Sequence, residues 1–139
     1  MYKKINSLPK KFKTFSFLLL LSFNSYANLR LACEAKNTIN LETNEFGLTS
    51  GVDYYEVKEL RNKKVTIKKD GLGVPFSGLM DEGSIQGKVS YNLPGFEKTF
   101  YQTIAINRYT GEIKTTFSIG QETGGLLHTG KCSEALKKF

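Results

Sequence analysis

Hydrophobic and polar residues alternate along several stretches of this chain, so that apolar side chains occupy every second position. The clearest stretches are 29–36, 64–68, 85–91, 100–107 and 112–119. A period of two puts successive side chains on opposite faces of a strand, and no stretch after residue 27 has the spacing of a long amphipathic helix. Strands with one apolar and one polar face are typical of antiparallel sheets that are packed on one side.

Turn signals separate these stretches. Residues 108–111 (RYTG) place glycine where a short hairpin loop needs a positive φ, which predicts direct pairing of 100–107 with 112–119. Residues 93–95 (LPG) predict a tight turn, and 61–63 (RNK) interrupt the apolar pattern. We therefore predict an all-β protein, a single antiparallel sandwich or small barrel of about 7–8 strands.

The first 27 residues have the three parts of a secretory signal peptide. Five lysines precede the apolar run FSFLLLLSF at 15–23, and Ser25-Tyr26-Ala27 follows, which predicts cleavage after Ala27. The mature chain is then expected to be one β-domain, residues 28–139. The apolar run reaches only about half of a ~30 Å hydrocarbon core at about 1.5 Å per residue, so we expect no permanent membrane span.

The charge of the chain is concentrated in that leader. The full sequence has a net charge of +7, but residues 28–139 carry 15 basic and 13 acidic side chains, a net charge of only +2. The basic footprint of nucleic-acid binding is therefore missing, and we expect no nucleic-acid partner. The expected location of the protein is the periplasm or the extracellular space.

Two cysteines remain after the leader, Cys33 near the start and Cys132 near the end. In an oxidising compartment such a pair favours a disulfide, which would join the first and last strands and nearly close the sheet. Two alternatives stay open: a pair of buried thiols, or lipidation of Cys33, because Leu31-Ala32-Cys33 resembles the residues before a lipoprotein cysteine. One histidine and two cysteines do not supply a zinc site, and no cofactor is predicted.

Candidate catalytic groups are few. His128 is the single imidazole and shares a strand face with Cys132, but no partner for a nucleophile–base pair is suggested. The adjacent acids Asp81 and Glu82 are expected to be solvated loop charges. Residues 71–78 are glycine-rich but lack the lysine and the helix start of a phosphate-binding loop. We predict that the protein is not an enzyme.

Apolar residues also gather in a segment that has neither strand nor helix period. They are Leu72, Val74, Phe76, Leu79 and Met80. We expect this segment either to cover one end of the core or to form a partner-contact surface, because an exposed apolar loop lowers solubility unless a partner covers it. In the second case the partner would be an envelope or extracellular protein.

The early Cys33, the late hairpin INRYTGE at 106–112 and the closing Gly130-Lys131-Cys132 together resemble a loose group of small exported bacterial β-rich proteins of unknown function. The likeness spans most of residues 28–139. It implies an exported β fold with a disulfide staple, and it implies no activity.

A shorter fragment, Ser50-Gly51-Val52-Asp53-Tyr54, resembles the Ser-Gly-x-x-Tyr motif of periplasmic lysozyme inhibitors, which are small exported β-barrels. The resemblance implies that Ser50 lies at the tip of a loop that enters the lysozyme cleft, with Tyr54 packed beneath it. Asp53 stands where some members carry a basic residue, and the family's second motif, built around Thr-Lys-Gly, is absent from this chain.

Three functions are compatible with these features. The first is a non-enzymatic exported domain that binds an envelope or extracellular partner through loops at one end of the sheet, including the apolar segment around Phe76. The second is lysozyme inhibition through Ser50 and Tyr54. The third is a carrier that holds a small apolar ligand inside a barrel, as lipocalins do.

Overall fold

The computed structural model describes residues 28–135, and the predicted signal peptide, residues 1–27, lies outside this part of the chain. The described residues form nine strands and one short 3-10 turn, η1 (Arg61–Lys63). The strands are β1 (Leu29–Asn40), β2 (Phe46–Leu48), β3 (Val52–Glu59), β4 (Lys64–Lys69), β5 (Phe76–Met80), β6 (Ser84–Tyr91), β7 (Phe100–Asn107), β8 (Glu112–Ile119) and β9 (Leu126–Glu134). No helix within residues 28–135 is long and apolar enough to cross a membrane.

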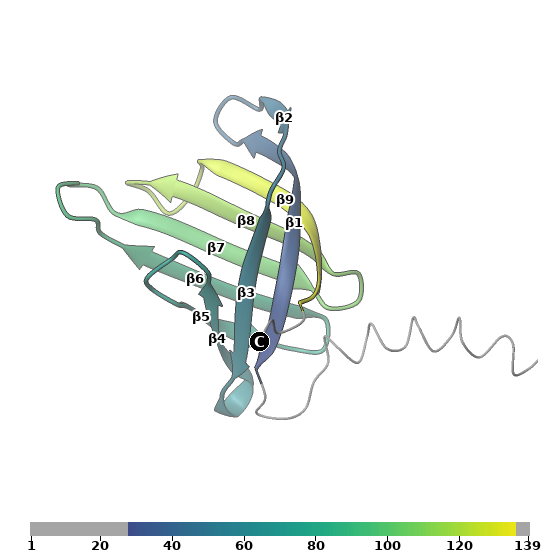
Figure 1. Ribbon diagram of the computed structural model, residues 1–139. Coiled ribbons are helices and arrows are strands. Elements are labelled where there is room, and N and C mark those ends of the chain that lie inside the picture. The colour runs from purple at the N-terminus through teal and green to yellow at the C-terminus, as the bar shows by residue number, and fades with distance from the viewer. Residues whose placement is uncertain (1–27, 136–139) are drawn as a thin grey trace, which may run out of the picture.

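The strands form one antiparallel sheet that closes on itself. Neighbours follow the chain order from β3 to β9, while β1 pairs with β3 and also with β9. The result is a closed barrel of eight strands, and β2 is an extra strand paired with the second half of β1. Figure 1 shows β1 and β3 crossing β6, β7 and β8 at a steep angle, with β2 projecting beyond the barrel. The predicted all-β antiparallel fold is confirmed, in its barrel form.

The alternating stretches become strands because every second side chain enters the barrel. In β7, for example, Phe100, Ile104 and Ile106 are buried, whereas Asn107 is exposed. The turn at 108–111 joins β7 directly to β8, as predicted. From β3 to β9 the order of the strands follows from connections between successive segments, whereas β1 pairs with β3 across the intervening β2 and with β9 at the far end of the chain.

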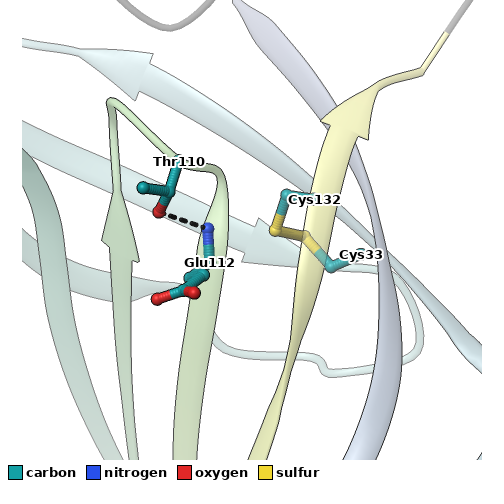
Figure 2. Close-up of a disulfide and its surroundings, with 4 residues drawn as sticks. All are labelled: Cys33, Thr110, Glu112 and Cys132. Carbon is teal, nitrogen blue, oxygen red and sulfur yellow. Dashed lines mark hydrogen bonds between the residues drawn. A yellow bond between two sulfur atoms is a disulfide. The ribbon is translucent and has the colours of Figure 1, made fainter.

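The disulfide between Cys33 and Cys132 is present, and it lies at the closure of the sheet. The two residues are directly paired in the ladder between β1 and β9, with Cα atoms 3.9 Å apart, and both are buried. Figure 2 shows the bond beside the β7–β8 turn, where Thr110 Oγ1 accepts a hydrogen bond from the Glu112 amide at 3.2 Å. The Cys132 amide donates to the Gly111 carbonyl at 2.8 Å, which ties the same turn to β9.

The two ends of the barrel differ in what fills them. The end that carries η1, the β5–β6 turn and the β7–β8 turn, called here the closed end, is packed with apolar side chains. They include Leu29, Leu31, Val57, Val65, Ile67, Phe76, Met80, Ile85, Ile104, Ile106 and Ile113. The opposite end, called the mouth, carries the β1–β2 turn and the segments 70–75, 92–99 and 120–125. A continuous core at one end therefore leaves the mouth free to hold polar groups.

Arg108 and Asp81 fasten the closed end. Arg108 is 8% exposed; its guanidinium donates to the Asp81 carbonyl and its amide donates to the Gly83 carbonyl at 2.9 Å. The Asp81 carboxylate in turn accepts hydrogen bonds from the amides of Gly83 and Ser84 at 2.8 and 2.7 Å. Asp81 is an exposed loop charge, as expected, and its carboxylate also organises the β5–β6 turn.

Strand β5 corrects one expectation. The apolar segment was expected to lack regular structure, but Phe76–Met80 pairs with β4 on one side and with β6 on the other. The sequence of β5 hides its alternation of inward and outward positions. The inward position 78 is glycine, and the outward position 79 is leucine. A Cβ at Gly78 would lie 1.7 Å from the Gln86 carbonyl oxygen, so the close approach of β6 requires glycine there.

Candidate functional site

A cavity of about 350 Å³ opens at the mouth of the barrel, between β1 and β3 on one side and β7, β8 and β9 on the other. We call this cavity the cup. Its lining comprises Cys33, Ala35, Thr49, Ser50, Gly51, Val52, Asp53, Tyr55, Lys69, Gln102, Ile113, Thr115, Thr116, Phe117, His128, Thr129 and Gly130. The cup thus begins where the apolar core ends, and most of its lining is polar.

Part of the cup lining is apolar. Cys33 and Ile113, both members of the buried core, belong to this part. Phe117 lines the wall, and its ring centroid lies 5.8 Å from that of Phe100, whose ring also stacks on Tyr91. Contacts between these rings stabilise the part of the wall that Phe117 forms.

The charged side chains of the cup lining form one ion pair. Lys69 Nζ lies 3.6 Å from Asp53 Oδ2, with Lys69 at the end of β4 and Asp53 near the start of β3. Both residues continue the inward faces of their strands, since Ile67 and Tyr55, two positions away, are buried. The pair carries no net charge, so the cup presents a positive and a negative group side by side.

Two further polar side chains are fixed by hydrogen bonds. Thr38 Oγ1 and His128 Nδ1 share a bond of 2.8 Å across the pairing of β1 with β9. Gln102 Nε2 donates to Tyr91 Oη at 2.7 Å across the pairing of β6 with β7. In both cases one polar atom is engaged in the wall, and the other end of the side chain stays available to the cup: Nε2 of His128 and Oε1 of Gln102.

Tyr55 is the most buried polar side chain in the cup. The residue is 2% exposed, yet within residues 28–135 its hydroxyl has no hydrogen-bond partner and is not sealed from solvent. Burial raises the pKa of this hydroxyl, and the nearby Asp53 carboxylate adds to the shift. Tyr55 is therefore a neutral hydrogen-bond donor, held in place by its own packing and pointing into the cup.

The residues of the Ser-Gly-x-x-Tyr fragment lie on two faces of the wall. Ser50 is exposed at the rim of the cup, in the connection between β2 and β3. This connection is anchored to β1, because the Ala35 amide donates to the Gly51 carbonyl at 3.0 Å and the Thr49 amide to the Lys36 carbonyl at 3.1 Å. Tyr54 lies on the outer face, 41% exposed, with the Arg30 guanidinium 5.8 Å from its ring centroid.

The apolar residues proposed as a contact surface are dispersed. Phe76 is 1% exposed and belongs to the core, so it cannot contact a partner at the surface, which corrects the expectation for this residue. Leu72 packs against the core from the mouth end, and Val74 is half-buried in the same connection. Leu79 is 60% exposed but lies on the outer face of β5. These side chains do not form one patch.

Several cup residues were missed by sequence reasoning. Asp53, Lys69, Gln102 and Thr115 occupy inward positions of strands whose other inward residues are apolar. A pattern in the sequence could have identified them. Several strands carry a polar residue at an inward-facing position near the same end of the barrel. No group of three or more His, Cys, Asp or Glu residues within the described chain is placed to hold a metal ion.

Comparison of the chain with protein-family models, with curated proteins and with solved structures gives no match. The function of the cup therefore has to be argued from its own geometry.

Proposed function

We propose that the protein is an exported, non-enzymatic binding protein that holds a small polar ligand in the cup. The cup itself carries this proposal: a cavity of about 350 Å³ lies within the size range of small-molecule sites, ~300–1,000 Å³. Such sites place a few fixed polar groups beside apolar side chains, and the cup lining contains both kinds, with polar residues in the majority. The buried disulfide and the leader-like residues 1–27 support export.

The non-enzymatic part of the proposal rests on how the proton-transfer groups are engaged. The carboxylate of Asp53 pairs with Lys69, and Nδ1 of His128 is bonded to Thr38. Nε2 of His128 still faces the cup, but the hydrogen bonds within residues 28–135 join the imidazole only to Thr38, so no third group completes a nucleophile–base–orienting set. Asp53 and His128 are well suited to orient a ligand.

A screen of small molecules by two-dimensional amide NMR tests this function. The library contains neutral polar, acidic, basic and apolar compounds, and the expected result is saturable shifts of the Thr115, His128 and Gly130 amides, which lie around the cup. Ala35→Phe should abolish these shifts by filling the cup from β1. The matched variant Ala32→Phe places the same ring on the outer face and should leave them in place. No saturable shift with any compound would overturn the proposal.

Lysozyme inhibition is a second candidate, favoured by one observation: Ser50 is exposed at the rim of the mouth on a backbone anchored to β1. A fixed, exposed rim residue suits insertion into an enzyme cleft. A cell-wall turbidity assay with several lysozyme types measures the inhibition. The variant Ser50→Trp is expected to block insertion of the rim into the lysozyme cleft. Unimpeded lysis at a large molar excess of the protein would rule the inhibitor function out.

A further inference from the structure

The cup balances hydrogen-bond donors and acceptors within a small volume. The donors are the Tyr55 hydroxyl and the Lys69 ammonium, and the acceptors are the Asp53 carboxylate and Gln102 Oε1. Thr115 Oγ1 donates and accepts, since a hydroxyl does both. A ligand that satisfies this set must supply both acceptors and donors, and hydroxyl groups supply the two together.

The electrostatics of the cup disfavour an ionic ligand. Asp53 and Lys69 already compensate each other at 3.6 Å, so a carboxylate or an ammonium on the ligand would meet a like charge beside the opposite one. The side chains are 51% and 27% exposed, so water also solvates the pair, and its net charge of zero gives an ionic ligand no overall attraction. A neutral hydroxyl instead bridges the pair, accepting from Lys69 and donating to Asp53.

The Tyr55 hydroxyl is a second observation that points to a ligand. It lines the cavity on a residue that is only 2% exposed and makes no hydrogen bond within residues 28–135, so it is left to bond water or a ligand. Beside it, Phe117 provides an apolar ring on the cup wall, which suits the C–H face of a sugar ring.

From these features we infer that the ligand of the cup is a neutral saccharide, held through its hydroxyl groups by Tyr55, the Asp53–Lys69 pair and Gln102 and packed against Phe117. The inference rests on the proposed binding function and specifies its ligand class. A cavity of about 350 Å³ suits a mono- or disaccharide, either free or as the end of a longer glycan, because it lies at the small end of the usual range of ligand sites.

Saturation-transfer NMR and titration calorimetry test the inference on the mature protein with its disulfide intact. The probes are D-glucose, D-galactose, N-acetyl-D-glucosamine and the β-1,4-linked disaccharides cellobiose and chitobiose. A second arm measures cosedimentation with insoluble cellulose and chitin, which separates a glycan end from a free sugar as the source of the ligand. Saturable binding in either arm is the expected result.

The deciding variant is Tyr55→Phe, which removes one oxygen and keeps the ring. It should weaken saccharide binding about tenfold, the effect of one lost hydrogen bond, with no loss of thermal stability. Tyr109→Phe makes the same change at the exposed closed-end turn and should leave the affinity unchanged. Wild-type affinity in Tyr55→Phe would overturn the assignment of the site.

The screen described under the proposed function separates the two possible failures. If no saccharide binds in either arm but other polar compounds still shift the amides around the cup, the saccharide inference is wrong and the binding function stands. If no compound of any class shifts those amides, the saccharide inference and the binding function are both wrong.

Discussion

Cys33 lies directly opposite Cys132 where the first strand of the barrel meets the last, so their disulfide spans the seam at which the sheet closes. All other neighbours in the barrel are successive in sequence, and β1–β9 is the one pairing that must close a long loop. The crosslink, with a sequence separation of 99, removes much of that closure entropy from the unfolded chain.

Replacing both cysteines with alanine should therefore lower the free energy of unfolding by about 2–5 kcal/mol. Urea unfolding of the oxidised wild type and of Cys33→Ala/Cys132→Ala measures the difference. Wild-type protein that is unfolded, reduced and refolded under reductant is the control and should match the variant. A difference in unfolding free energy below about 1 kcal/mol would show that the pairing of β1 with β9 closes the barrel without help from the disulfide.

Phe76 and Leu79 should respond oppositely to the same substitution. Phe76→Ser removes a buried ring and should cost about 3–5 kcal/mol, since Phe76 is 1% exposed. Leu79→Ser changes a 60% exposed side chain and should remain within about 0.5 kcal/mol of the wild type. Thermal melts of the two single variants decide the matter. An equal loss of stability in the two variants would mean that the outer face of β5 is covered.

Asp81 should make the stability of the protein depend on acid pH. The amides of Gly83 and Ser84 lower the pKa of its carboxyl, so the folded state favours the charged form. The stabilisation is present above the ordinary aspartate value of 3.8 and is lost as the pH falls through the lower folded value. We expect the difference in Tm between wild type and Asp81→Ala to stay constant from neutral pH to about pH 5 and to shrink below about pH 4. A difference that does not change with pH would show that the charge of Asp81 is not involved.

Lys63 occupies a backbone conformation that suits glycine. Its φ is 62°, in the left-handed region that costs a residue with a Cβ roughly 1 kcal/mol or more. Lys63→Gly should therefore stabilise the protein by about 0.5–1 kcal/mol in urea unfolding. Lys63→Ala removes the long side chain but keeps the Cβ, and should give no comparable gain. Equal gains in the two variants would assign the effect to the lysine charge.

The fold was largely predictable because its determinants are local. The alternating pattern identified most strands, and the interruption at 61–63, the turn at 93–95 and the hairpin at 108–111 lie between successive strands in the structure. The two terminal cysteines indicated that the first and last strands are neighbours. Strand β5 was missed because an inward glycine and an outward leucine reverse the visible pattern.

The cup was not predictable in the same way. Alternation assumes that inward positions are apolar, and it treats Gln102 or Thr115 as an interruption of a strand rather than as the lining of a cavity. Tyr55 looks from the sequence like any core aromatic. Only the depth of each residue along its strand, which follows from the register between strands, shows that these positions lie at one level of the barrel.

The division of the barrel interior into an apolar closed end and a polar mouth has a consequence for how this chain can change. Most core residues and most residues of the cup lining occupy different stretches of the same strands, and Cys33, Tyr55 and Ile113 at the boundary belong to both sets. Under the proposed binding function, substitutions at Gln102, Thr115 or Lys69 would change which ligand the cup prefers while leaving the packing around Ile67 and Ile106 in place. Ligand preference and stability could then change largely independently of each other.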